Sequence, residues 1–424
     1  MAVTESGEFR VEARAPGKVI LSGEHAVVHG TSAVAAALGL YTTATIRPGM
    51  DDSCVLDLPQ LGVYSKWPLK MIEELITQPH LLNPKPAHVT SYSESEWPQL
   101  AAFVERQVRS LSAKGAKGAD AAVTAFLFLY TSILGLQPAT VRVSSELPVG
   151  AGLGSSAAYC VALTTALLAY SREIELPQLP SVGEEVSTDR KIWFDVDEKK
   201  VDLVNKWAFE GERIIHGRPS GIDNTVSTYG YVVKFKKGQI TRLHTQMPLR
   251  MLLTNTQVGR NTKALVAGVG ERALRHPAAM GAIFKAIDEI AEEVVTILQT
   301  PPETARLGKS GEVVSSDECG PHPVAKTVQE IRLQELVDMN QGLLQGIGVS
   351  HLSIESICQI TAAYRLSSKL TGAGGGGCVL TLLPHKLSST SVELVKVDIE
   401  GKGFSCFEAV IGGNGVQVSC QAVS

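Results

Sequence analysis

The residues best suited to phosphate chemistry lie in the stretch "PVGAGLGSSAA", residues 148–158. Alternating glycines let backbone N–H groups approach a phosphate closely. The apolar run that follows predicts a helix, whose N-terminus would add unpaired N–H donors. Ser155 and Ser156 stand where hydroxyls cap such a helix or reach a metal ion. Two interpretations stay open: a phosphate-binding loop, or a tight turn closed by a capping serine.

The spacing of this loop excludes two common phosphate-binding motifs. No Lys follows the last glycine, so the stretch does not fit GxxxxGK[ST]. Ser155 stands where GxGxxG requires its third glycine. The sequence therefore supports neither a P-loop nucleotidase nor a Rossmann dinucleotide site.

Two charged residues in turn-like segments are candidates for the chemistry that a phosphate loop would serve. Lys18 lies in "PGK" and Asp223 in "PSGIDN", which we interpret as a turn after a helix. Taken alone, Lys18 would be a solvated charge and Asp223 a turn residue bonding its own backbone.

Glu212, in the predicted helix "NKWAFEGERIIHG", is the candidate metal ligand. Helical periodicity places it on the side of Ala208 and Ile215, which is expected to face inward. The neighbouring Glu210 projects about 160° away. The alternative for Glu212 is a solvated helix carboxylate.

The elements expected to position these residues mix helices and strands throughout the chain. We expect two short strands over 9–23 joined at Pro16-Gly17, and a helix or buried strand over 31–40, where alanine favours helix. A strand over 139–148 leads into the glycine loop and a helix over 156–170. Residues 224–243 resemble a hairpin that turns near Lys236-Lys237-Gly238. The mixture indicates an α and β protein.

Length and composition bound the possible functions. A chain of 424 residues is expected to form two domains, which we place at 1–245 and 246–424. The formal net charge of −4 offers no general attraction for nucleic acid or an anionic membrane. The apolar run from residue 157 to 168 is too short to span a bilayer. No signal peptide is evident, and seven cysteines without a CxxC pair are typical of a reducing compartment, so we expect a cytoplasmic protein.

Two more stretches give the glycine loop a family context. "APGKVILSGEHAVVHG" (15–30), "PVGAGLGSSAA" and "TGAGGGGCVLTLL" (371–383) match, in this order, the three motifs of the GHMP kinases, the superfamily of galacto-, homoserine, mevalonate and phosphomevalonate kinases. Ala-Val-Val after the GEH tripeptide differs from the Asp-Tyr of galactokinases. Together with residues 205–230 and 252–268, the motifs closely resemble the mevalonate kinase branch over nearly the full length.

The resemblance implies a fold and a reaction. The implied fold class is α+β, with an N-terminal domain like that of a ribosomal protein, a C-terminal ferredoxin-like domain and the active site in the cleft between them. The implied reaction is ATP-dependent phosphorylation of the C5 hydroxyl of (R)-mevalonate, with Mg²⁺ as cofactor, in isoprenoid and sterol synthesis. The branch is typically homodimeric and is inhibited by prenyl diphosphates.

The resemblance also implies residue roles. Asp223 faces the substrate hydroxyl as general base, Lys18 pairs with it and reaches the phosphates, and Ser156 and Glu212 hold the metal. Glu24 supports Lys18, and His25 lines the acceptor pocket. The remaining nucleotide-binding residues are Gln60, where relatives carry Asn, together with Ser145, Gly150, Ala151, Gly152, Leu153, Gly154 and Ser155. The remaining acceptor-binding residues are Arg260, Thr262, Gly372 and Ala373.

Two rival functions predict a different pattern of site residues. Another kinase of the same superfamily would keep the motifs and differ in the acceptor pocket. A ligand sensor without catalysis would be expected to lose Asp223, Lys18 or Ser156, and all three are present.

Overall fold

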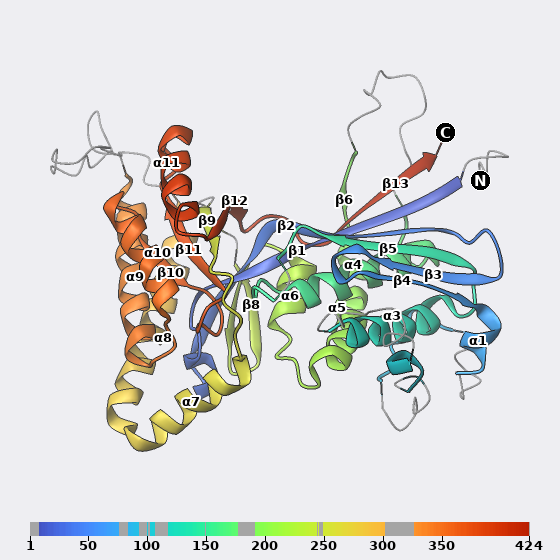
Figure 1. Cartoon of the computed structure of the whole chain (residues 1–424), viewed down its shortest axis with the longest axis horizontal. Helices are drawn as coiled ribbons and strands as arrows, with labels where there is room; N and C mark the ends of the chain where they lie inside the picture. The colour runs from blue at the N-terminus through green and yellow to red at the C-terminus, as the bar shows by residue number, and fades with distance from the viewer. Residues whose placement is uncertain are drawn as a thin grey trace.

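The computed structural model describes residues 8–75, 84–92, 100, 102–106, 118–148, 150–176, 191–243, 245, 249–301 and 326–423. The polar stretches 80–120 and 300–325, whose composition predicts surface loops, lie largely outside these residues. One half of the molecule carries strands covered by helices α3 to α6, and the other carries helices α7 to α11 beside shorter strands (Figure 1).

The strands of the N-terminal half are β1 (Glu8–Ser22), β2 (Ser32–Pro48), β3 (Ser53–Leu58), β4 (Val63–Pro68), β5 (Ala139–Ser145), β6 (Phe194–Asp195), β7 (Val232–Lys236) and β8 (Gln239–Leu243). Its helices are α1 (Leu69–Glu73), α3 (Ala119–Leu134), α4 (Ser155–Tyr170), α5 (Glu198–His216) and α6 (Ile222–Tyr229), with short 3-10 turns at Ala26–His29 and Pro59–Leu61.

The C-terminal half contains β9 (Leu249–Asn255), β10 (Ser368–Leu370), β11 (Cys378–Leu383), β12 (Ser405–Ile411) and β13 (Gln417–Val423). Its helices are α7 (Thr262–Arg275), α8 (Pro277–Gln299), α9 (Val328–Gly346), α10 (Leu352–Ala363) and α11 (Ser389–Glu400).

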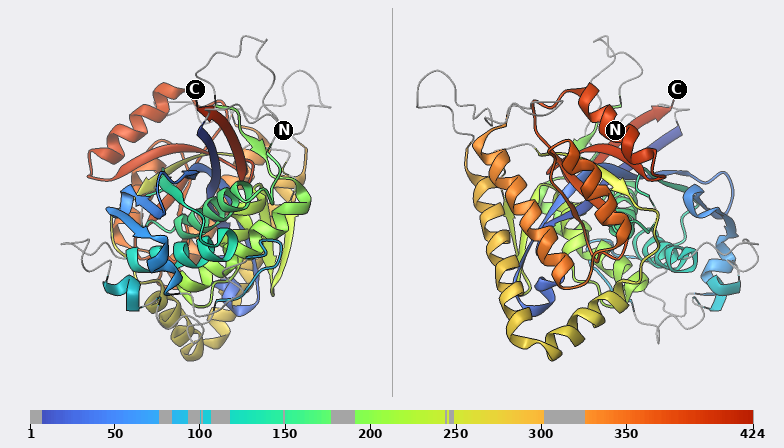
Figure 2. Two further views of the ribbon diagram at one scale, coloured as in Figure 1. Left: turned by 90° about the vertical axis from the view of Figure 1, so that its right-hand side faces the viewer. Right: turned by 60° about the vertical axis from the view of Figure 1, so that its left-hand side comes forward.

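One continuous sheet connects both halves, in the order β10-β11-β9-β12-β2-β1-β13-β6, with β5 and β7 also paired to β2. The link from β12 to β2 is a single pair, Ile411 opposite Leu38. The last strand, β13, pairs with β1 and so returns to the N-terminal strands. The domain boundary near residue 245 stays a prediction. Strand β13 lies beside β1, so the end of the described chain packs against the N-terminal strands (Figure 2).

Two predictions about the elements are wrong, and a third that left two alternatives open is decided by the structure. The two strands expected over 9–23 are one strand, which passes Pro16 and Gly17 through a shift in register. For the alanine-rich stretch after residue 31, predicted as a helix or a buried strand, the structure shows the strand, with its small side chains buried against α4 and α6. Residues 222–229 are helix rather than hairpin, so Asp223 lies in the first turn of α6 and not in a loop.

The other element predictions that fall on described residues agree with the structure. The helices predicted over 156–170 and 205–217 correspond to α4 and α5, the strand predicted over 139–148 corresponds to β5, and β7 and β8 form the hairpin with Gly238 at its turn. Helix α4 is buried along most of its length, between β1 and β2 on one side and α5 on the other.

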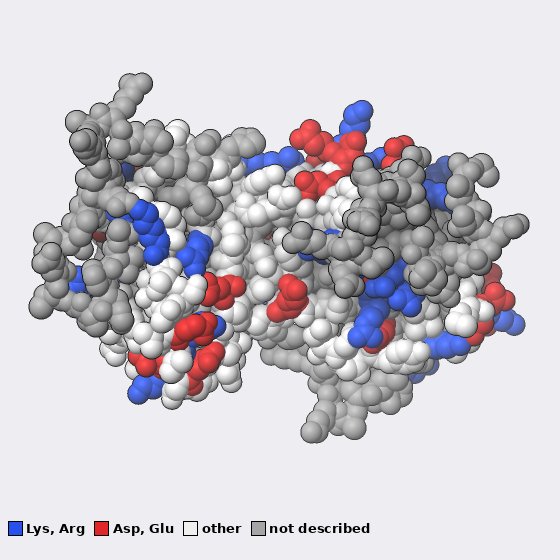
Figure 3. Space-filling view, turned by 90° about the horizontal axis from the view of Figure 1, so that it is seen from above, with Lys and Arg blue, Asp and Glu red and all other residues white. Residues whose placement is uncertain are grey.

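The described residues also show the state of the cysteines, the absence of a membrane-spanning helix among them and the distribution of charge on one face. The cysteines whose side chains are described, at positions 54, 160, 358, 378 and 406, are free thiols. Within the described ranges, no helix is long and apolar enough to cross a membrane. On the face drawn in Figure 3, basic and acidic side chains are interspersed.

Candidate active site

The glycine loop is held against β1 by the backbone. Lys18 N–H donates to the Leu153 carbonyl oxygen at 2.8 Å. A Cβ at Gly17 would lie 2.8 Å from that same oxygen, so only glycine permits this approach. Gly152 and Gly154 have φ values of 79° and 72°, and α4 begins directly after them. The strand, loop and helix therefore form the predicted cradle at a helix N-terminus.

Lys18 and Asp223 face each other across this loop. The Lys18 Nζ lies 3.3 Å from Asp223 Oδ1. A Cβ at Gly154 would lie 2.7 Å from Lys18 Cγ, so the lysine stem packs directly on the loop. The predicted pairing is present, and it places a cation and a carboxylate at the mouth of the cradle.

Glu212 is buried next to this pair, as its position on α5 predicted. Its Oε1 is buried and has no hydrogen-bond partner among the described residues. Burial, and then the charge of Asp223, raise the pKa of Glu212 to about 8, while Ser156 and Lys18 act in the opposite direction. An orphaned buried carboxylate oxygen beside a serine hydroxyl is a fitting donor set for a hard cation.

Glu210, the rejected alternative, has a different role. Its carboxylate accepts hydrogen bonds from Arg213 Nη1 at 2.9 Å and from the Tyr92 backbone N–H at 3.1 Å. Ser91 donates to the same group at 3.3 Å. Glu210 is therefore buried too, but its oxygens are already bonded to Arg213 and to the segment at Ser91 and Tyr92, so they are not available to a ligand.

Arg260 lies between the glycine loop and the third motif. A Cβ at Gly152 would lie 1.5 Å from its Nη2, and one at Gly372 would lie 3.2 Å from its Nη1. Nη1 is buried without a hydrogen-bond partner in the described part of the chain. Burial lowers the pKa of Arg260 from its ordinary value. An unpaired guanidinium donor at this point can receive an anionic group.

The other acceptor-pocket candidates are only partly brought together. His25 Nε2 lies 2.8 Å from the Ala373 carbonyl oxygen, which joins the first and third motifs. Burial lowers the pKa of His25. Thr262 is exposed at the first residue of α7. Of the nucleotide-binding candidates, Gln60 Nε2 donates to the Ser145 carbonyl at 3.2 Å, and the Ser145 hydroxyl lies 2.7 Å from Thr42 Oγ1.

Glu24 is a correction to the expected roles. Its carboxylate pairs with Lys369, and Asn340 Nδ2 lies 3.4 Å from Oε2. The expectation that Glu24 supports Lys18 is therefore wrong, because the partners of both oxygens lie on β10 and α9. Glu24 and Lys369 are 345 residues apart in the sequence, so no local sequence pattern reveals their contact.

Sequence reasoning also missed His216. Its Nε2 lies 3.0 Å from Ser156 Oγ, and burial lowers its pKa. His216 follows Glu212 by four residues on α5, so the same helical-face argument could have found it.

A glycine loop at a helix N-terminus, a Lys–Asp pair and a buried orphan carboxylate are together suited to phosphoryl transfer to a small molecule. The family model described as "GHMP kinases N terminal domain" matches residues 120–231. The chain is 49% identical to mevalonate kinase of Arabidopsis thaliana over 417 residues, covering 97% of this chain and 100% of that protein. It is 41% identical to mevalonate kinase of Homo sapiens over 413 residues, covering 95% and 93%. The chain therefore belongs to the mevalonate kinase family.

Solved structures agree with the fold. Mevalonate kinase of Methanococcus jannaschii superposes with a TM-score of 0.62 at 21% identity, covering 94% of this chain and 97% of that one. The L. major enzyme in complex with R-mevalonate gives a TM-score of 0.60 at 20% identity, covering 97% of both chains. At these identities the superpositions support the GHMP kinase fold alone.

Proposed function

We propose that this protein transfers the γ-phosphoryl group of ATP to the C5 hydroxyl of (R)-mevalonate, giving 5-phosphomevalonate and ADP. The observation that carries the proposal is the Lys18–Asp223 pair, with 3.3 Å between Nζ and Oδ1, at the mouth of the glycine loop. The family membership supplies the acceptor, since the relatives at 49% and 41% identity are mevalonate kinases.

The reaction assigned to this pair is a direct transfer of the phosphoryl group from ATP to the hydroxyl oxygen. The C5 oxygen attacks the γ-phosphorus and forms the new O–P bond while the bond to the β,γ-bridging oxygen breaks and ADP leaves with the electron pair. An alcohol whose pKa approaches that of bulk water, about 15.7, is not deprotonated beforehand by a carboxylate. Asp223 therefore orients the hydroxyl and takes its proton late, and Lys18 stabilises the charge on the transferring group.

A divalent cation fits the same site. We assign Ser156 and Glu212 to Mg²⁺, because the Glu212 oxygen is buried and without a partner among the described residues. Mg²⁺ commonly takes one or two protein ligands and completes its shell with phosphates and water. Among the described residues, no group of three or more His, Cys, Asp and Glu side chains could hold a metal ion. When bound, the ion neutralises charge on the phosphates.

The other site residues divide between the two substrates in this proposal. Residues 150–156 wrap the phosphates, and Gln60 and Ser145 lie toward the rest of the nucleotide. Arg260 receives the mevalonate carboxylate, since its Nη1 is a buried donor without a partner in the described chain. His25 lines the acceptor pocket with Gly372 and Ala373, and Thr262 lies at its rim.

A coupled ADP-release assay with Mg-ATP tests the reaction. Mevalonate, phosphomevalonate, galactose and homoserine are offered in parallel, and turnover is expected with mevalonate alone. Turnover with another acceptor would contradict the assignment of the pocket around His25 and Arg260. Binding of ATP without turnover of any acceptor would favour a ligand sensor instead.

We also propose, on the family membership, a cytoplasmic homodimer inhibited by prenyl diphosphates. Sedimentation at several concentrations tests the dimer. Farnesyl diphosphate titrated against ATP in the same assay tests the inhibition, and competition with ATP is the expected pattern.

A further inference from the structure

A buried ion pair connects the first and third motifs away from the reacting groups. Lys369, on β10, pairs through Nζ with Glu24, and their side chains are 2% and 0% exposed. Lys369 Nζ also donates to the Leu370 carbonyl oxygen at 2.7 Å and lies 3.5 Å from the Ile20 carbonyl oxygen. The ammonium group thus has an acceptor for each of its three protons, and two of these acceptors lie in the first motif.

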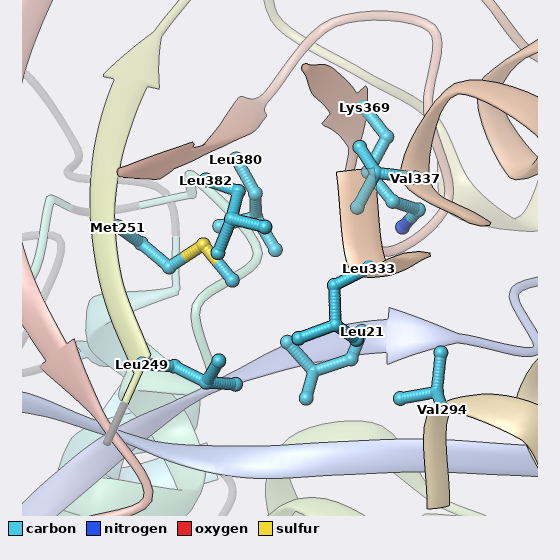
Figure 4. A pocket seen from close by; sticks show the side chains of 9 residues that line it. All are labelled: Leu21, Leu249, Met251, Val294, Leu333, Val337, Lys369, Leu380 and Leu382. Atoms are coloured by element: carbon cyan, nitrogen blue, oxygen red, sulfur yellow. The ribbon is translucent and has the colours of Figure 1, made fainter. Parts of the chain in front are cut away.

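The surroundings of Lys369 make this pairing obligatory. Its side chain lies at the edge of a small cavity whose other walls are apolar (Figure 4). The apolar wall is formed by Leu21, Leu249, Met251, Val294, Leu333, Val337, Leu380 and Leu382. Because no polar group of this wall can replace the carboxylate, an unpaired charge here would be strongly unfavourable.

The pair lies where residues 20–25 of the first motif meet residues 369–373 beside the third, a contact region that we call the junction. The acceptor-pocket candidates His25 and Ala373 belong to it. Next to Glu24, His25 has a φ of 60°, a left-handed conformation that a non-glycine residue adopts at a cost. His25 Nε2 lies 2.8 Å from the Ala373 carbonyl oxygen. Thr371 Oγ1 accepts from Ile20 N–H at 2.9 Å and donates to the Ile20 carbonyl at 3.1 Å. Residues on either side of the ion pair therefore fix the two loops against each other.

We propose that Lys369 is a positioning residue for the acceptor pocket. It holds Glu24, and through the Gly23–His25 turn it sets where His25 and Ala373 lie relative to the Lys18–Asp223 pair. Lys369 itself touches neither substrate. This inference rests on the proposed function for its kinetic readout, whereas its structural readout stands without any substrate.

Two variants test the proposal. Lys369→Met removes the ammonium and leaves an apolar side chain that suits the cavity, but Glu24 stays buried without its cation, with Asn340 Nδ2 at 3.4 Å from its Oε2. The double variant Glu24→Gln with Lys369→Met removes both charges, so it folds even where the single variant does not. Lys200→Met is the matched control, because Lys200 loses a 2.6 Å pair with Glu173 at the start of α5.

The first measurement is amide hydrogen exchange without substrates. In the double variant we expect exchange at residues 23–25 and 371–373 to accelerate about tenfold or more. Exchange in α3 and in the core of α4 is expected to stay as in the wild type. Unchanged exchange at the junction would overturn the proposal.

The second measurement separates positioning from mere stability. We expect the KM for mevalonate to rise about tenfold in the double variant, while the KM for ATP stays within about twofold. A lower melting temperature with both KM values unchanged would show a structural role alone and overturn the proposal. Failure of the wild type to use mevalonate would refute the proposed function, and the exchange result would still decide on the junction.

Discussion

The two lysine–carboxylate pairs near the glycine motifs differ in what can reach them. Lys18 and Asp223 lie 3.3 Å apart, and the Asp223 side chain is 35% exposed. Lys369 and Glu24 are sealed, with side chains 2% and 0% exposed. The same two functional groups therefore serve two purposes. An open pair can exchange its partner for a substrate atom, whereas a sealed pair fixes the chain around it.

The strongest way to break the open pair is Asp223→Asn. The amide keeps the size of the carboxylate but cannot take the hydroxyl proton, so kcat should fall by roughly 10²–10⁴-fold. The ADP-release assay measures it, with fluorescence titration of ATP to show that the nucleotide still binds. A variant with near-normal kcat would remove Asp223 from the mechanism.

Lys18→Met breaks the same pair from the cationic side. Loss of one donor to the transferring phosphoryl group should lower kcat by roughly 10²–10³-fold. Its partner Asp223 can still be solvated, so the melting temperature should change less than in Lys369→Met. The two variants are compared by steady-state kinetics and thermal unfolding, and a larger stability loss for Lys18→Met would contradict the open-pair description.

Breaking the sealed pair should affect the free energy of unfolding more than kcat, the reverse of what is expected for the open pair. Removing one partner of a buried ion pair costs about 3–5 kcal/mol. Lys369→Met should therefore lower the free energy of unfolding by about this amount, measured by urea denaturation. The double variant with Glu24→Gln should recover a large part of the loss. Equal stability of the single variant and the wild type would mean that Glu24 is not held as a charge.

The open pair was within reach of the sequence, and the sealed pair was not. Lys18 and the glycine loop lie in short motifs, and helical periodicity pointed Glu212 inward. Glu24 and Lys369 pair across 345 residues, and their contact depends on how β10 meets the end of β1. Such a contact is set by tertiary packing, so a motif can show that Glu24 matters without showing what it binds.

For two elements the local sequence preference points away from the observed structure. Alanines after residue 31 favour a helix locally, but pairing with β1 and β7 makes them a strand. The proline and glycine before Asp223 predict a turn, whereas the structure shows Asp223 in the short helix α6. In the first case pairing with neighbouring strands overrides a local preference, and in the second a helix of eight residues follows turn-forming residues.

Glu212, which is buried next to the open Lys18–Asp223 pair, predicts how the stability of the protein depends on pH. Its ordinary pKa of 4.5 is raised to about 8 in the folded protein. Between these values the folded protein holds a proton that the unfolded chain has lost, so stability should fall as the pH rises through this window. Thermal unfolding in the presence of a chelator measures the slope, and Glu212→Gln should remove it. A wild type as pH-dependent as the variant would contradict the assignment.

The smallest effect is expected where a lysine–carboxylate pair is neither sealed nor part of the site. Lys200 Nζ lies 2.6 Å from Glu173 Oε1, with side chains 36% and 25% exposed. Water can replace either partner, so Lys200→Met should change the free energy of unfolding by only about 0–1 kcal/mol. Its kcat and both KM values should match the wild type. If this variant instead lost as much stability as Lys369→Met, burial would not be what distinguishes the sealed pair, and the comparison itself would fail.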